Sequence, residues 1–187
     1  MSNATLLFLQ HILPHDGWKV AIAKTPDGMY HRWCASFEEQ ADFLQRWSAS
    51  GYDTYHACAA FKEPGTSRSG RKQTNVHRIR SLWADIDTRE GKPTAPYADR
   101  GEAIKALGAF CLAAPLPRPV VVSSGFGLHA YWPFDEALPL HEWLPYAQGL
   151  KHRASKLGFH MDPARTADAA SILRTPGTTN WKGVRAW

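Results

Sequence analysis

The spacing of apolar residues predicts a mixed α/β segment at the start of the chain. Two short apolar runs, 18–23 and 29–34, predict strands, and the Pro- and Gly-containing tetrapeptide 25–28 predicts the turn between them. Ser36 and Glu39 form a capping box, and the apolar residues that follow recur at helical spacing. The pattern therefore predicts a strand hairpin followed by a helix.

A change in composition then predicts a boundary. Residues 52–61 have the pattern of another strand, whereas 63–72 are basic and rich in glycine and serine. We expect an N-terminal α/β lobe over residues 1–70 and a second unit over 71–187, both within one catalytic domain.

The second unit has a regular alternation of strand and helix patterns. Asp99 and Glu102 form another capping box, and Gly158 is typical of a helix end. The strands are expected at 79–87, 119–123, 128–132 and 171–174, with one helix after residue 99 and another over 140–157. This β-α-β-β-α-β order predicts an α+β fold that is RNA-recognition-motif-like, with strands ordered fourth, first, third, second.

Two aspartates alternate with apolar residues at the end of the first of these strands. Asp85 and Asp87 would face the same way, because side chains on a strand repeat with a period of two. Two carboxylates on the same face of a strand repel each other. Their oxygens suit a hard ion such as Mg²⁺ or Mn²⁺. The alternative is a strand end that turns polar as it reaches solvent.

The expected topology places more polar groups beside this pair. His129 would begin the third strand at the same edge, and Asp162 precedes the fourth strand. Four polar groups from distant positions are therefore predicted to converge on one rim of the sheet.

The turn between the second and third strands has the composition of a phosphate-binding loop. Gly125 and Gly127 would let the backbone approach a ligand, and Ser124 and His129 supply side-chain donors. A hairpin turn followed by a hydrogen-bonded core histidine is the competing interpretation.

The same stretch also resembles the RNA-recognition-motif signature around Gly-Phe-Gly. In that interpretation Tyr131 and Trp132 would belong to a non-catalytic single-strand binder. Aspartates on the neighbouring central strand would repel a phosphodiester unless a metal intervened, which disfavours this interpretation.

The C-terminal stretch combines cations with a turn. Arg174 precedes Pro-Gly, and Asn180 and Lys182 follow within a few residues, as in a triphosphate clamp. A surface loop is the alternative. A further basic group is a candidate template-binding groove or, equally, a solvated loop; it comprises Arg68, Arg71, Lys72, Arg78 and Arg80.

Taken in order, these motifs resemble the archaeo-eukaryotic primase superfamily, most closely the primase-polymerases of phages, plasmids and other mobile elements. The resemblance covers roughly residues 72 to 182. It rests on Asp85-Ile-Asp87, the stretch from Ser124 to His129, Asp162, and Arg174-Thr-Pro-Gly177.

The resemblance implies template-directed nucleotidyl transfer, with NTP or dNTP as substrate and single-stranded DNA as template. It implies that Asp85, Asp87 and Asp162 hold two divalent ions, Mg²⁺ or Mn²⁺, and that His129 is catalytic. The implied nucleotide-binding residues are Ser124, Gly125, Gly127, His129, Arg174, Asn180 and Lys182.

Two aspartates compete for the third metal position. The primase pattern favours Asp162, which lies about twelve residues before the arginine, over Asp168. Asp168 would then orient Arg174 from behind.

Composition adds a few limits to this picture. The net charge of +5 and pI of about 9.2 agree weakly with a polyanionic partner. Cys34, Cys58 and Cys111 have no disulfide or zinc spacing, so no zinc is expected. We expect a cytoplasmic protein without a membrane partner, part of a longer chain with a helicase or accessory C-terminal domain. A metal-dependent nuclease is the other enzymatic alternative.

Overall fold

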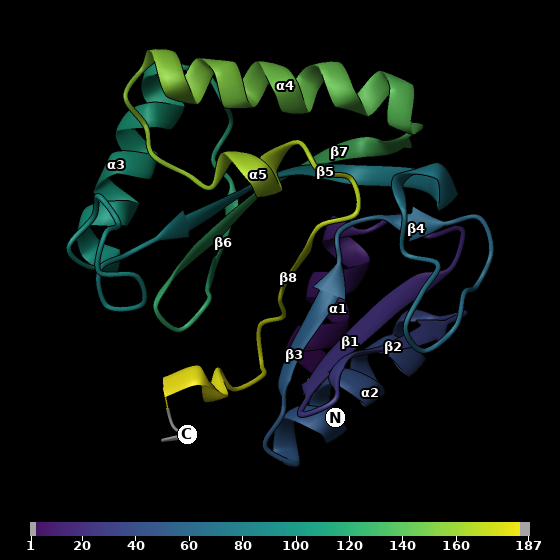
Figure 1. Cartoon of the computed structure of the whole chain (residues 1–187). Helices are drawn as coiled ribbons and strands as arrows, with labels where there is room; N and C mark the ends of the chain where they lie inside the picture. The colour runs from purple at the N-terminus through teal and green to yellow at the C-terminus, as the bar shows by residue number, and fades with distance from the viewer. Residues whose placement is uncertain (1–2, 184–187) are drawn as a thin grey trace.

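Two four-stranded antiparallel sheets organise the computed structural model, which describes residues 3–183 (Figure 1). The first sheet has the order β2-β1-β3-β8 and is formed by β1 (Lys19–Thr25), β2 (Gly28–Cys34), β3 (Asp53–Ala57) and β8 (Ile172–Arg174). The second has the order β4-β5-β7-β6 and is formed by β4 (Ala60–Phe61), β5 (Val76–Asp87), β6 (Val120–Ser123) and β7 (Gly127–Leu138).

Helices cover these sheets and complete an α+β fold. They are α1 (Asn3–Ile12), α2 (Phe37–Ala49), α3 (Arg100–Ala113), α4 (Leu140–Lys156) and α5 (Pro163–Thr166), with 3₁₀ turns at Gln73–Asn75 and Trp181–Gly183. Helix α2 packs on the first sheet, whereas α3 and α4 pack on β7 and β5 (Figure 1). Buried side chains from both sheets belong to one continuous core, in which Trp83 stacks on Trp143 at 4.9 Å.

Both predicted capping boxes are present. The Ser36 hydroxyl accepts the Glu39 N–H at the start of α2, and the Asp99 carboxylate accepts the Glu102 N–H at the start of α3. These contacts are local in sequence, so the sequence pattern alone suffices to predict them.

The predicted strand order is right for three strands and wrong for the fourth. Strands β5, β7 and β6 are adjacent, with β5 and β7 in the centre, as expected. The last strand, β8, instead pairs with β3 in the other sheet, where Arg174 lies opposite Tyr55. Beside β5, the Asp162 N–H donates to the Asp85 carbonyl at 2.7 Å and α5 packs on the strand. The segment before β8 therefore lies beside β5 as the short helix α5, and β8 then pairs with the edge of the first sheet at β3.

Strand β7 is longer than predicted. It was expected to stop at Pro133 but continues to Leu138. Pro133 pairs with Ser81 next to an irregularity in the register, and β6 ends its pairing with β7 at Tyr131. A proline is tolerated at such a position because its missing N–H is not required by a neighbouring strand.

Two other differences concern the N-terminal segment. Helix α1 was not predicted, although it packs on α2 and β7. The single strand expected over 52–61 is divided into β3 and β4, which belong to different sheets. The two sheets thus exchange strands between the halves of the chain, and the division at residue 70 stays a prediction.

Two general expectations concern membranes and thiols. Within residues 3–183, no helix is both long enough and apolar enough to cross a membrane. Cys34, Cys58 and Cys111 are buried free thiols.

A fully buried histidine connects the two sheets. His56 on β3 has its Nδ1 3.0 Å from the Thr175 hydroxyl and its Nε2 3.5 Å from the Tyr131 hydroxyl on β7. Burial, with His129 nearby, lowers the pKa of His56 to about 3. The ring is therefore neutral in the folded protein.

This histidine is expected to make the fold sensitive to acid. The unfolded chain takes up a proton at His56 below about pH 6.5, whereas the folded chain does not, so stability is lost as the pH falls from there towards 3. Between pH 7 and 4.5 the loss is about 2–3 kcal/mol. In urea denaturation, the free energy of unfolding of His56→Gln should fall by this amount less than that of the wild type between pH 7 and 4.5. The exposed His152→Gln should behave as the wild type, and an unchanged decrease in His56→Gln would contradict the assignment.

Candidate functional site

A cavity of about 250 Å³ brings together residues from both sheets. Most of the predicted site residues line it, namely Asp85, Asp87, Ser124, His129, Arg174, Asn180 and Lys182. Residues that were not predicted complete the lining, among them Met29, Tyr55 and Arg165. Of the four polar groups expected at one rim, Asp85, Asp87 and His129 therefore line this cavity, and Asp162 lines a neighbouring one.

Asp85 and His129 form the floor of the charged part of this cavity. They lie directly opposite each other in the β5–β7 pairing, with His129 Nε2 3.5 Å from Asp85 Oδ1. Burial, reinforced by the charges of Asp87 and Asp162, raises the pKa of Asp85 to about 7. Around neutral pH this carboxyl therefore holds a proton part of the time unless a cation lies close to it.

His129 is neutral and has an unused acceptor or donor. Burial, with the positive charge of Arg174 close by, lowers the pKa of His129 to about 3. Its Nδ1 is buried and has no hydrogen-bond partner among the residues that the structure describes. A buried polar atom without a partner is unfavourable, so the fold carries this cost at His129.

Asp87 belongs to two neighbouring cavities. It lines the first cavity together with Asp85, and it also lines one of about 170 Å³ with Lys92 and Asp162. The Lys92 ammonium lies 3.1 Å from Asp87 Oδ2, and this contact raises the pKa of Lys92. A side-chain cation thus occupies the space beside the carboxylates.

The two candidates for the third metal ligand, Asp162 and Asp168, have different surroundings. The Asp162 N–H donates to the Asp85 carbonyl, and Asp162 Oδ1 accepts the Ala164 N–H as the cap of α5. Asp168 accepts hydrogen bonds from the Ala170 N–H and the Ser171 hydroxyl. Asp162 therefore lies beside the carboxylate pair, whereas Asp168 is held by its own loop.

The glycines of the β6–β7 turn face protein atoms. Gly125 has φ of +102°, and a Cβ there would meet Asn180 at 2.6 Å; a Cβ on Gly127 would meet the Ile86 carbonyl at 2.5 Å. Asn180 Nδ2 also donates to the Ser124 carbonyl at 2.8 Å. These glycines therefore let the C-terminal segment and β5 approach the turn, and Ser124 itself lines the cavity.

The chain resembles known proteins in structure and not in sequence. No protein-family model and no curated protein sequence matches it. Solved structures match over nearly its whole length. The primase-polymerase domain of cyanophage S-2L aligns with a TM-score of 0.67 and 16% identity, over 97% of this chain and 85% of that one. The chain has an archaeo-eukaryotic primase-type fold.

Two further structures support the same fold. The catalytic domain of primase RepB′, solved in complex with initiator DNA, aligns with a TM-score of 0.59 and 20% identity over 98% of this chain and 82% of that one. The polymerase domain of Mycobacterium tuberculosis ligase D, solved in complex with DNA, has a TM-score of 0.53 and 15% identity, with 96% and 75% coverage.

Within this primase-type fold, the guanidinium of Arg174 is held by a carboxylate that the sequence did not reveal. Asp53 at the start of β3 pairs with Arg174 Nη1 at 2.7 Å, and both side chains are nearly buried. Arg174 also lies over the Tyr55 ring, 4.9 Å from its centroid. Asp168, the predicted orienter of Arg174, instead accepts hydrogen bonds from the Ala170 N–H and the Ser171 hydroxyl, and its orienting role stays a prediction.

The same carboxylate also holds the segment after β8. Asp53 Oδ1 accepts the Trp181 N–H at 2.8 Å, and the Trp181 ring N–H donates to the Ser48 carbonyl at 3.0 Å. Asn180 and Lys182 flank Trp181 and line the cavity. One side chain thus positions three of the predicted nucleotide-binding residues. A polar residue at the start of a predicted strand gave no signal of this role.

The predicted basic groove is not formed as a single surface. The Arg78 and Arg80 guanidinium groups donate to carbonyls and line another cavity, with Asp16, Asp135 and Glu136. They lie at the opposite end of β5 from Asp85, roughly 20 Å away at strand spacing. Arg68 and Arg71 donate to the carbonyls of Asp27 and Ala170. A template-binding role for these residues, and for Lys72, stays a prediction.

The aromatic residues of the alternative binding module are inaccessible. Tyr131 is fully buried and Trp132 is 5% exposed, with its ring N–H donating to the Pro117 carbonyl. Neither ring is exposed to a base, so Tyr131 and Trp132 do not form the stacking surface that this interpretation expects.

The predicted metal ligands are the carboxylates of Asp85, Asp87 and Asp162. Within the described residues, no group of three or more His, Cys, Asp or Glu side chains is arranged closely enough to hold an ion. The donor chemistry nevertheless fits a hard divalent cation, because carboxylates supply the oxygens, and burial together with the charges of Asp87 and Asp162 raises the pKa of Asp85. The cation of Lys92 already lies beside Asp87.

The contact between Asp53 and Arg174 predicts a measurable loss of stability. Asp53→Ala leaves a nearly buried guanidinium and the Trp181 N–H without their acceptor, which should lower the free energy of unfolding by about 2–4 kcal/mol. Asp42→Ala removes a carboxylate from the exposed ion pair with Arg46 and should cost under about 1 kcal/mol. Urea denaturation measures both, and equal effects would contradict the role of Asp53.

Proposed function

We propose that the chain is a template-directed nucleotidyltransferase of the primase-polymerase type. It would add nucleotides from NTP or dNTP on a single-stranded DNA template. The observation that carries the proposal is the cavity in which the Asp85–Asp87 pair faces the cations Arg165, Arg174 and Lys182. Similar folds in a primase-polymerase, a primase and a polymerase domain support it.

The cavity divides into an acidic and a basic part, which suit the two halves of a nucleotide-transfer site. Asp85 and Asp87 in the acidic part, together with Asp162 from the neighbouring cavity, would hold two divalent ions, Mg²⁺ or Mn²⁺. Bound there, such ions would lower the pKa of the attacking hydroxyl and neutralise charge on the leaving pyrophosphate. A helicase or accessory domain is a further proposed partner.

The chain's own residues would bind and orient the triphosphate in the basic part. Arg174, fixed by Asp53, offers its planar guanidinium to phosphate oxygens, and Lys182 adds a second charge. His129 lines the same cavity as a neutral ring, and its buried Nδ1 is not open to a phosphate oxygen. The pocket would thus fix the nucleotide without requiring His129 to be charged.

Primer extension tests the proposal most directly. Asp85→Ala/Asp87→Ala should lower extension with Mg²⁺ or Mn²⁺ to below about 1% of wild type, because charge stabilisation by bound metal contributes several kcal/mol. The matched control is Asp135→Ala/Glu136→Ala, which removes two exposed carboxylates from the far part of the same sheet. Equal extension by the wild type and the Asp85/Asp87 variant would refute the function.

The same reaction without nucleotide separates a polymerase from a nuclease. Labelled single-stranded DNA incubated with protein and metal should remain intact. Metal-dependent shortening that is lost in Asp85→Ala/Asp87→Ala would instead assign the carboxylates to hydrolysis.

Lys92 should compete with metal for Asp87. Since its ammonium lies 3.1 Å from Asp87 and is exposed, Lys92→Gln should strengthen Mn²⁺ binding by about 2- to 5-fold. Electron paramagnetic resonance of free Mn²⁺ measures this affinity without turnover. Lys105→Gln, an exposed lysine on α3, is the control, and an unchanged affinity in Lys92→Gln would contradict the competition.

A further inference from the structure

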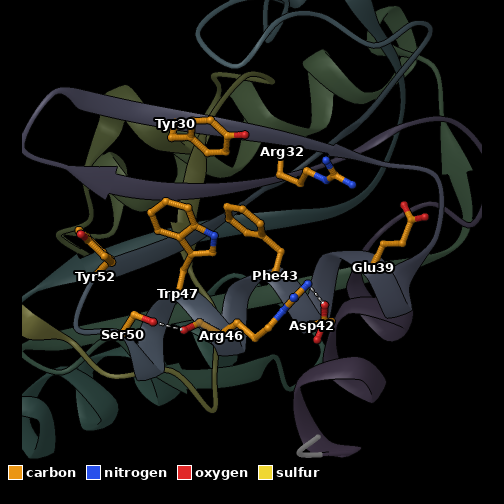
Figure 2. A pocket seen from close by; sticks show the side chains of 9 residues that line it. All are labelled: Tyr30, Arg32, Glu39, Asp42, Phe43, Arg46, Trp47, Ser50 and Tyr52. Carbon is orange, nitrogen blue, oxygen red and sulfur yellow. Dashed lines mark hydrogen bonds and ion pairs between the residues drawn. The ribbon is translucent and has the colours of Figure 1, made fainter.

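A second cavity of about 490 Å³ lies on the other side of the first sheet, between β2 and α2 (Figure 2). Its lining is formed by Tyr30, Arg32, Glu39, Asp42, Phe43, Arg46, Trp47, Ser50 and Tyr52. We refer to this cavity as the aromatic groove. None of these residues takes part in the candidate active site.

Three rings of the aromatic groove are nearly parallel. The planes of Tyr30 and Trp47 differ by 17°, with ring centroids 5.6 Å apart, and the Tyr30 and Phe43 planes also differ by 17°. Phe43 and Trp47 lie four residues apart on α2, which places them on the same side of the helix. These rings stack on one another, so a planar ligand would stack on an outer face of the cluster, whereas a cage for an alkylated ammonium needs rings on several sides.

One cation in the aromatic groove is available to a ligand. Arg46 is paired with Asp42, and the Glu39 carboxylate accepts the Ala35 N–H (Figure 2 shows the Arg46–Asp42 contact). The Arg32 guanidinium is exposed and has no hydrogen-bond or ion-pair partner in the described part of the chain. The two carboxylates are thus already engaged, and Arg32 is free to meet an anionic group.

The aromatic groove and the candidate active site are on opposite faces of one sheet. Met29 lines the active-site cavity and its neighbour Tyr30 lines the aromatic groove. Successive side chains on a strand point to opposite faces, which accounts for this division.

We propose that the aromatic groove is a second binding site for single-stranded DNA. One base stacks on the ring of Trp47, and its phosphate pairs with Arg32. Stacking on aromatic rings is independent of base identity, because every base has a π-face. The proposal rests on the proposed function only for the identity of the partner, because it requires neither metal nor catalysis.

Fluorescence anisotropy with a labelled 20-nucleotide oligo(dT), without metal or nucleotide, tests the site. Trp47→Ala should weaken binding by about 5- to 100-fold, the range for one lost base stack. A 20-residue abasic strand carries the same phosphates without bases, so its binding should not change between wild type and Trp47→Ala.

Two more variants keep the test valid if Trp47→Ala fails to fold. Trp47→Phe retains a ring and should bind within about 3-fold of wild type. Arg32→Gln changes an exposed side chain, and it should reduce the slope of log K against log salt by about 0.7, as expected for one lost phosphate contact. Tyr146→Ala, which removes an exposed aromatic residue from α4, should have no effect.

The outcomes separate this inference from the catalytic proposal. Binding of oligo(dT) that is equal in wild type, Trp47→Ala and Arg32→Gln would overturn it and leave a protein segment as the better occupant. When Trp47→Ala is combined with Asp85→Ala/Asp87→Ala, the affinity for oligo(dT) should fall as much as it does in the wild-type background. If that loss is present while primer extension is unaffected by the aspartates, the groove stands and the catalytic proposal fails.

Discussion

The ion pair between Asp53 and Arg174 holds the candidate site together. Strand β8 has three residues, too few to fix its own position, and this contact ties it to β3 while the same carboxylate holds the Trp181 N–H. Both side chains are shielded from water, so the attraction is little screened, and a lost partner leaves a costly charge. The C-terminal side of the cavity depends on one carboxylate from the N-terminal half of the chain.

Three aspartates lie close together in the other part of the site. Asp85 and Asp87 face one way from β5, and Asp162 is brought beside them by its N–H bond to Asp85. Burial of Asp85 and the like charges of Asp87 and Asp162 beside it are unfavourable for its ionised form, and together they raise its pKa. A cation that binds only the folded state would recover this cost, so metal binding and folding stability should be linked.

Local sequence signals were sufficient to predict part of this arrangement. The contacts between residues far apart in the sequence could not be predicted from them. The alternation around Asp85 and Asp87, the capping boxes and the central position of β5 and β7 follow from spacing alone. The pairing of β8 with β3 could not be predicted, because a three-residue strand carries no pattern that selects one sheet edge over another. Asp53 was missed for the same reason, since its partners lie more than 120 residues away.

The edge of the first sheet connects its two faces. Strand β2 is the edge strand, and the loop after β4 covers it: the His31 N–H donates to the Ser67 carbonyl and Arg68 donates to the Asp27 carbonyl. One route between the active-site cavity and the aromatic groove runs past this edge strand. The basic loop predicted to meet the template therefore lies where such a path crosses from one face to the other, although it lines neither cavity.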